Sequence, residues 1–274
     1  MSARPAAAAP RLLRLAHLLH LDPASADQLA ADLAELPADD VRVLTDLVGE
    51  ALHGRVRHRF VGIAALAGKL PGPVAASFAE KFLPPRLAAR VAENLQPAQA
   101  AALVGRIPVG YLAELAVALD PTSSARVVAA IPPPQVVAVA LELFRRGQHV
   151  TMAELAGAVS REGLRAAVDA ASARDLLLCL PHAEWTADLD AVVDALPDAR
   201  VDELLREVAR DGLWAEAESL LTSVDPAVVD RVVHRAAVLD EALVDRFRGA
   251  GEGGLLGPAS QGLLHRALEV RGQR

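Results

Sequence analysis

The acidic residues between positions 182 and 203 have the clearest potential for chemistry in this sequence. One histidine and four carboxylates fall close together there: His182, Glu184, Asp188, Asp190 and Asp194. Hard cations such as Mg²⁺ bind carboxylate oxygens, usually a few of them with several waters retained. Asp188, Asp190 and Asp194 are therefore weak candidates for the ligands of a divalent cation. A solvated acidic helix face is the commoner role of such a charge run, and the sequence favours that role.

The densest positive cluster lies earlier, at the expected start of a helix. It consists of His53, Arg55, Arg57, His58 and Arg59. Guanidinium groups bind phosphates and carboxylates through paired hydrogen bonds. Arg55, Arg57, His58 and Arg59 are accordingly the candidate partner-binding residues, with a phosphate or an acidic peptide as the ligand. The alternative is a solvated helix start that nearby acidic residues neutralise.

The sequence contains no recognisable catalytic motif. It has no Gly-x-Ser-x-Gly elbow and no His-Glu-x-x-His zinc motif. The glycines within 249–254 do not follow an expected strand, as a phosphate loop would require. The one cysteine, Cys179, lies in an apolar run and is expected in the core. We therefore expect a protein that is not an enzyme and that uses no cofactor and no metal.

Composition indicates an all-α protein that does not bind nucleic acid. Hydrophobic residues make up 53% of the 274 residues but aromatic residues only 3%, so alanine, leucine and valine supply the apolar mass. These residues suit closely packed helices better than a sheet. The net charge of −7 gives no attraction to nucleic acid. Because we find neither a signal peptide nor an apolar run of about 18 residues, we expect a cytoplasmic protein without an integral membrane segment.

An apolar residue closes an expected helix every 12 residues between positions 83 and 143. These marker residues are Leu83, Leu95, Ile107, Leu119, Ile131 and Leu143. Proline follows nearly every marker, directly or after one residue, and so ends one helix and begins the next. The turns alternate between no inserted residue and one, which makes the full unit a helical hairpin of 24 residues. Self-similarity at a fixed period is typical of repeat proteins.

Each marker from Leu95 to Leu143 is expected to share a helix face with the apolar residue four positions before it. These paired residues are Val91, Leu103, Leu115, Val127 and Val139. The residue after each of them alternates between one with a small side chain and one with a branched side chain: Ala92, Val104, Ala116, Val128 and Ala140. The alternation predicts that successive helices meet different neighbours. We also expect Leu119 to be fully buried, so that Leu119→Ala would cost on the order of 2–5 kcal/mol.

The rest of the chain continues the helical pattern at looser spacing. Residues 1–10 are rich in alanine and proline and are expected to be disordered, and residues 11–248 form the helical array. Residues 249–258 are expected to form a glycine-rich linker, and 259–274 a C-terminal helix. That helix can fold back as a cap or reach a neighbouring chain, which makes a homodimer one expectation.

Short polar residues mark several expected helix starts. Asp120, Ser160 and Ser172 are expected N-caps, because their side chains can accept a hydrogen bond from a free amide of the first turn. Thr151 and Glu154 have the spacing of a capping box, which predicts another helix start there.

The Leu-Pro and Leu-Asp-Pro helix ends from Leu83 to Pro132, together with the marker pairs, carry a family resemblance. They resemble the cytosolic N-terminal superhelical domain of the MgtE-type magnesium transporters over about residues 65–140. The resemblance implies a right-handed α-solenoid, or superhelix, of short helical hairpins in a HEAT-like array. In that family a nucleotide-binding-like domain pair and a membrane channel follow, and this sequence contains neither. No metal-binding residue is carried over from the family.

The expected function is that of a scaffold or adaptor that binds a protein or peptide partner through its repeat surface. The alternative is a regulatory domain that senses a divalent cation such as Mg²⁺ through the acidic helix face at 182–203.

Overall fold

The computed structural model describes residues 23–33, 40–41, 43–44, 47–48, 57–67, 69–183 and 187–273, and these residues form helices and turns without any strand. The expectation of an all-α protein is confirmed. The elements are α2 (Pro23–Asp32), α4 (Arg57–Ala67), α5 (Gly72–Phe82), α6 (Pro85–Ala92), α7 (Pro97–Val104), α8 (Val109–Ala118), α9 (Pro121–Val128), α10 (Pro133–Arg145), α11 (His149–Ala156), α12 (Arg161–Ala170), α13 (Ala173–Cys179), the 3₁₀ turn η3 (Leu180–His182), α14 (Ala187–Asp194), α15 (Asp198–Asp211), α16 (Trp214–Ser223), α17 (Pro226–Ala236), α18 (Glu241–Glu252) and α19 (Pro258–Gly272).

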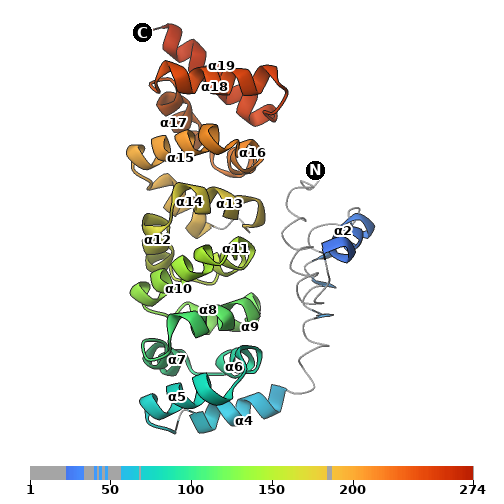
Figure 1. Ribbon diagram of the computed structural model, residues 1–274, viewed down its shortest axis with the longest axis vertical. Coiled ribbons are helices and arrows are strands. Elements are labelled where there is room, and N and C mark those ends of the chain that lie inside the picture. The colour runs from blue at the N-terminus through green and yellow to red at the C-terminus, as the bar shows by residue number, and fades with distance from the viewer. Residues whose placement is uncertain are drawn as a thin grey trace.

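From α4 onward the helices are stacked along one long axis, with α4 and α5 at one end and α18 and α19 at the other (Figure 1). From α4 to α15, each helix packs mainly against the second helix along the chain. One series of contacts joins α4, α6, α8, α10, α12 and α14, and a second joins α5, α7, α9, α11, α13, α15 and α17. In the middle of the first series the helices begin at Pro85, Val109 and Pro133, which are 24 residues apart. The 24-residue spacing of the sequence is thus the step from one helix to its stacked neighbour.

Proline and short polar side chains set the helix boundaries. Pro84, Pro108 and Pro132 occupy N-cap positions of α6, α8 and α10. Asp120 caps α9 by accepting a hydrogen bond from the Ser123 amide at 2.7 Å. The other two expected N-caps also accept a first-turn amide: Ser160 from Gly163, and Ser172 from Asp175. These sequence predictions are confirmed.

The predicted helix start at Thr151 is wrong. Gly147 has a φ of +69°, a left-handed conformation that glycine adopts without a steric penalty, and it ends α10. The next helix, α11, then begins at His149, with Gln148 as its N-cap. Thr151 therefore lies inside α11 and is buried.

Arginine contacts between layers are more frequent in the C-terminal half of the stack, although Arg90 on α6 makes one in the N-terminal half, to the Ala118 carbonyl at the end of α8. In the C-terminal half, arginine side chains donate to backbone carbonyl groups at the ends of helices packed beside them. Arg231 on α17 donates to the Asp194 carbonyl at 2.6 Å, and Arg271 on α19 to the Leu239 carbonyl at 2.7 Å. Arg200 on α15 donates to the Ala171 carbonyl. A cation at a helix C-terminus satisfies free carbonyl groups and complements the helix dipole.

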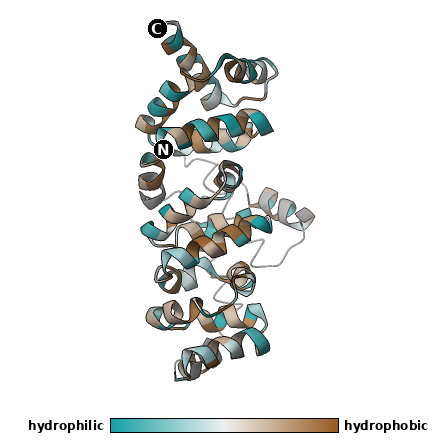
Figure 2. Cartoon of the chain, turned by 60° about the vertical axis from the view of Figure 1, so that its left-hand side comes forward, coloured by the Kyte–Doolittle hydropathy of each residue, from teal (hydrophilic) through white to brown (hydrophobic). Residues whose placement is uncertain are grey.

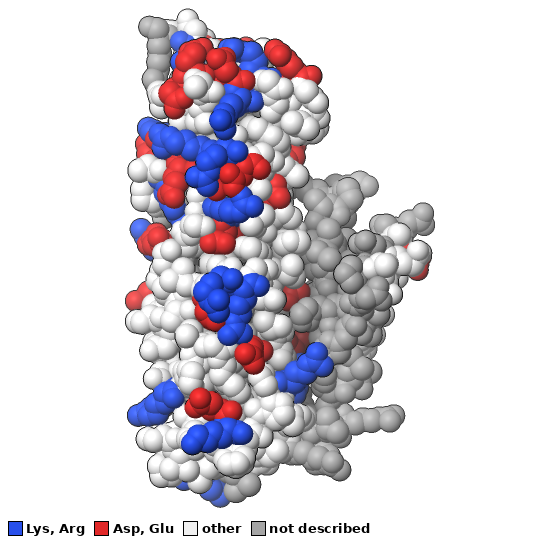
Figure 3. All heavy atoms as spheres, viewed as in Figure 1, with Lys and Arg blue, Asp and Glu red and all other residues white. Residues whose placement is uncertain are grey.

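Charged and hydrophilic residues are also more frequent in the C-terminal half of the stack. On the face shown in Figure 3, paired acidic and basic side chains gather toward the C-terminal end and are sparse over the N-terminal helices. Figure 2 shows hydrophobic segments in the middle of the stack and more hydrophilic colour toward the C-terminal end. The α7 sequence has no charged residue, and α8 has only Glu114. The N-terminal half therefore depends more on apolar packing between its layers, beside polar contacts such as those of Arg90 and Tyr111.

The last helix closes the C-terminal end of the stack. Helix α18 runs to Glu252, so the first residues of the expected glycine-rich linker are helical. Helix α19 packs against α16, α17 and α18, and its Leu263 and Ala267 belong to the buried core there. This helix folds back on its own chain, which is one of the two arrangements that the sequence allows.

Candidate functional site

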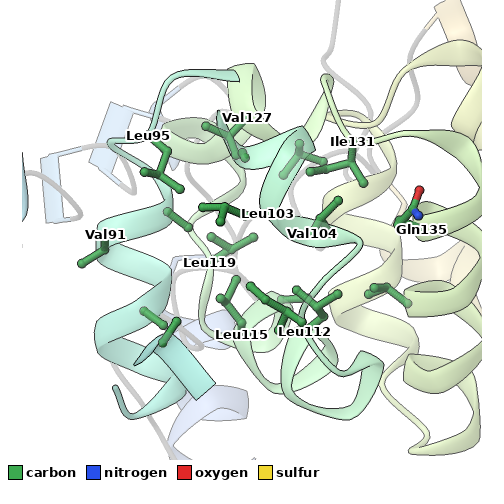
Figure 4. Close-up of a pocket in the computed structure, with 18 of the residues that line it drawn as sticks. Val91, Leu95, Leu103, Val104, Leu112, Leu115, Leu119, Val127, Ile131 and Gln135 are labelled. Carbon is green, nitrogen blue, oxygen red and sulfur yellow. The ribbon is translucent and has the colours of Figure 1, made fainter. Parts of the chain in front are cut away.

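An apolar cavity of about 710 Å³ lies between the helices of the N-terminal half. Its walls come from α4 to α11 and from the turns between them. All six marker residues line it: Leu83, Leu95, Ile107, Leu119, Ile131 and Leu143. The residues paired with them line it too: Val91, Leu103, Leu115, Val127 and Val139. Figure 4 shows ten of the lining residues by name, with side chains from several helices directed into one space. The 12-residue pattern thus builds the wall of one cavity.

Leu119 shows how this cavity changes the packing. It was expected to be fully buried, and that prediction is wrong, because Leu119 is only half-buried. Leu103 and Leu115, which line the same space, are also half-buried. By contrast Ala113 on α8 and Ala140 on the stacked helix α10 are almost completely enclosed. The backbone layers are close together, but the large side chains face a space that they do not fill.

A closed and empty cavity of this volume would be costly. At about 24 cal/mol per Å³, the cost would be on the order of 17 kcal/mol, and this cavity avoids part of it because some of its lining residues are exposed at the surface. The whole stability of a folded domain is typically about 5–15 kcal/mol. Ordered water is a poor filling, because each buried water needs about two to four polar partners. The geometry therefore calls for an apolar occupant.

Among the described residues that line the cavity, two have polar side chains, Lys69 and Gln135. Gln135 lies in the first turn of α10, and its Oε1 is buried without a hydrogen-bond partner. Lys69 is exposed in the turn between α4 and α5. Within the described ranges, no carboxylate forms an ion pair with Lys69. Sequence reasoning missed both residues, because an isolated lysine and an isolated glutamine carry no motif.

The cavity reaches the surface at the end of the stack formed by α4 and α5. Ile63, Leu70 and Phe78 line it, yet they remain 40%, 45% and 48% exposed. Lys69 belongs to the same group of exposed lining residues. We call these four residues the cavity mouth.

A second apolar feature is a stripe on the outside of α5. Val74, Phe78 and Phe82 are spaced four residues apart and therefore lie along one helix face. They are 51%, 48% and 68% exposed, and the rings of Phe78 and Phe82 are 5.2 Å apart. Val74 and Phe82 do not line the cavity, so this α5 stripe and the cavity mouth share only Phe78. Contiguous exposed apolar surface of this kind marks interaction sites in folded proteins.

The structure does not assemble the expected cation site. Asp188 and Asp190 lie on α14, but their side chains are outside the described residues. Asp194 is exposed at the end of α14. His182 is half-buried, and burial, with the nearby His149, lowers its pKa. Among the side chains that the structure describes, no three histidine, cysteine, aspartate or glutamate residues are grouped as metal ligands.

The basic cluster is not placed either. Arg55 lies outside the described residues. Arg57, His58 and Arg59 form the first turn of α4, but the structure does not describe their side chains. The assignment of these four residues to partner binding stays a prediction.

Cys179 does not have the surroundings of a reactive thiol. It is half-buried rather than fully enclosed, and its Sγ lies 3.5 Å from the carbonyl oxygen of His149. Burial, with the nearby Asp175 carboxylate, raises the pKa of this thiol to about 12. The thiolate required of a nucleophile is therefore scarce at neutral pH.

Comparison with known proteins gives no match to a family model, a curated protein or a solved structure. No helix in the described part of the chain is long and apolar enough to cross a bilayer. Function must therefore be argued from the cavity and the α5 stripe themselves.

Proposed function

We propose that this chain is a non-enzymatic scaffold or adaptor that binds a protein partner. In this proposal the stack is a right-handed α-solenoid of short helical hairpins, similar to a HEAT array. The contacts between every second helix and the 24-residue steps between helix starts support it. Arrays in which each repeat touches only its neighbours present long surfaces for partners.

The observation that carries the proposal is the α5 stripe. Val74, Phe78 and Phe82 expose two aromatic rings and a branched side chain along two turns of one helix. Aromatic residues dominate the binding energy of protein interfaces, because they bury a large area with few rotatable bonds. An amphipathic helix of a partner, laid along α5 with its own apolar face inward, is the ligand that fits this surface.

The resemblance to the MgtE N-terminal domain belongs to this proposal as well, and it concerns architecture alone. Sensing of a divalent cation such as Mg²⁺ stays a sequence-based hypothesis, since the side chains of Asp188 and Asp190 lie outside the described residues. A cytoplasmic location is proposed with the scaffold role, in keeping with a chain that has one cysteine and hence no internal disulfide.

A homodimer is the other form of partner binding that the sequence suggested. Exchange of α19 between chains is not needed to bury its apolar face, because Leu263 and Ala267 are already enclosed within the chain. In this proposal self-association uses the α5 stripe, and light scattering of the concentrated protein measures it directly.

The experiment is co-purification from the native host with wild-type protein and two variants. Phe82→Ser removes the most exposed ring of the stripe, and Leu141→Ser removes an exposed apolar residue on α10, outside the stripe. The proposal predicts that wild type and Leu141→Ser recover the same partner in stoichiometric amount and that Phe82→Ser loses it. The proposal fails if all three proteins recover the same set. It also fails if Phe82→Ser unfolds more easily than Leu141→Ser, because the stripe would then be packed within the chain itself.

A further inference from the structure

The scaffold role leaves the interior cavity without a purpose, although the six markers and their paired residues face it. A volume of about 710 Å³ lies in the range of roughly 300–1,000 Å³ that is usual for small-molecule sites. Such sites are mostly apolar and contain a few polar groups that fix the orientation of the ligand. The cavity has this character, with one cation at its mouth and one amide inside.

The residues that line the cavity are spread along the stack. The cavity wall passes through α5, α7, α9 and α11, which pack in series. Packed helices lie about 8–10 Å apart, so three such steps give a length of roughly 24–30 Å. A flexible chain fits this space better than a compact ring system does.

The cavity mouth adds a charge to this shape. Lys69 stands beside Ile63, Leu70 and Phe78, so an apolar ligand that enters there passes an ammonium group. The ammonium carries three hydrogen-bond donors and is not neutralised by a described carboxylate. A ligand with an apolar tail and an anionic end group would bury its tail in the cavity. Its end group would form an ion pair with Lys69.

We propose that the cavity binds a long-chain fatty acid. The tail lies along the marker residues, and the carboxylate pairs with Lys69 at the cavity mouth. The tail displaces no well-bound water, because the wall offers water few partners. Among the described residues, Gln135 is the one polar side chain beside the tail, and its unpaired Oε1 weakens binding of an unsubstituted chain.

The test uses full-length protein stripped of bound lipid and titrated by calorimetry with saturated fatty acids of increasing length. One acid is expected to bind per chain, with affinity rising about fourfold for each added methylene until the cavity is full. Hexadecanol, which has the same tail as palmitic acid but a neutral end group, is expected to bind several-fold more weakly than that acid.

Four variants locate the site. Lys69→Gln is expected to lower the affinity for palmitic acid to that for hexadecanol. Lys81→Gln, which changes an exposed lysine of α5 outside the cavity wall, should leave both affinities unchanged. Leu115→Trp places a larger side chain in the cavity and should weaken binding of palmitic acid, and Gln135→Met should strengthen it.

Two results would overturn the proposal. If wild type binds palmitic acid and hexadecanol equally and Lys69→Gln changes neither, the carboxylate is not recognised at the mouth. If wild type binds neither ligand, or if Leu115→Trp binds palmitic acid as tightly as wild type does, the cavity is not a fatty-acid site. Retained hexadecanol binding by Lys69→Gln shows that this variant is folded, so a lost acid preference cannot be ascribed to unfolding.

Discussion

Glu218 on α16 accepts two hydrogen bonds from Ser260 on α19, one from the backbone amide at 2.8 Å and one from the hydroxyl at 2.6 Å. The same carboxylate accepts a third hydrogen bond from the Ala259 amide at 2.8 Å. It therefore caps the N-terminus of α19 from a neighbouring helix. Gly257 makes room for it, because a Cβ at that position would lie 2.4 Å from the Glu218 side chain.

Glu218→Gln is expected to loosen the last helix. The neutral amide presents one acceptor oxygen instead of two, so at least one capping hydrogen bond is lost. The expected cost is about 1 kcal/mol, allowing for the partial exposure of this side chain. Urea unfolding measures the loss, and hydrogen exchange should show faster exchange within α19. Glu252→Gln, at an exposed position, is the matched control.

The same carboxylate predicts a pH dependence. Burial alone would raise the pKa of Glu218, but the hydrogen bonds from Ser260 and Ala259 outweigh it and lower the pKa below the usual 4.5. A lowered carboxyl pKa gives stability that is present above 4.5 and lost as the pH falls through the folded-state value. The difference in unfolding free energy between wild type and Glu218→Gln should therefore shrink on acidification. A difference that stays constant from pH 7 to pH 3 contradicts this assignment.

The carboxylate of Glu93 should give the opposite pH dependence of stability. Burial is the main cause that raises its pKa above 4.5, against the hydrogen bonds from the Asp120 amide and from Arg90. A raised carboxyl pKa means that the folded state takes up its proton more readily than the unfolded chain does. Wild type should therefore gain stability relative to Glu93→Gln as the pH falls from 7 toward 4.5. Unfolding free energies measured in a pH series test this, and a loss of relative stability over that interval contradicts it.

Helix boundaries could be read from the sequence where a local rule decides them. Asp120, Ser160 and Ser172 each cap a helix as expected, because an N-cap depends on residues only a few positions away. Thr151 obeyed the same local rule but lies within α11. There the left-handed turn at Gly147 sets the helix start, and nothing in the Thr151–Glu154 spacing indicates that turn.

The cavity could not be predicted in the same way, because it depends on the separation of two layers. The sequence predicts correctly that the marker residues and their paired residues share helix faces. It does not show whether opposing faces meet or stand apart. One signal was available: the alanines at positions 92, 116 and 140 remove volume once per 24 residues, and all three line the cavity.

This difference in packing predicts unequal costs for truncating two leucines. Leu164 is buried in the core of α8–α14 and does not line the cavity, so Leu164→Ala should cost about 2–5 kcal/mol. Leu119→Ala should cost only about 1–2 kcal/mol, because the half-buried side chain already faces open space. Urea unfolding of both variants tests the contrast, and equal losses would mean that Leu119 is packed as tightly as Leu164.

The most direct test of the cavity introduces a larger side chain at one residue that lines the cavity and at one residue that is buried in the closed core. Leu115 faces the cavity and Leu164 the closed core, so the unfolding free energies of Leu115→Phe and Leu164→Phe are compared in lipid-free protein. Leu164→Phe should lose about 1–3 kcal/mol through overpacking. Leu115→Phe should match or exceed wild type in stability, because the larger ring enters unfilled apolar space. A loss for Leu115→Phe as large as that for Leu164→Phe would contradict the existence of the cavity.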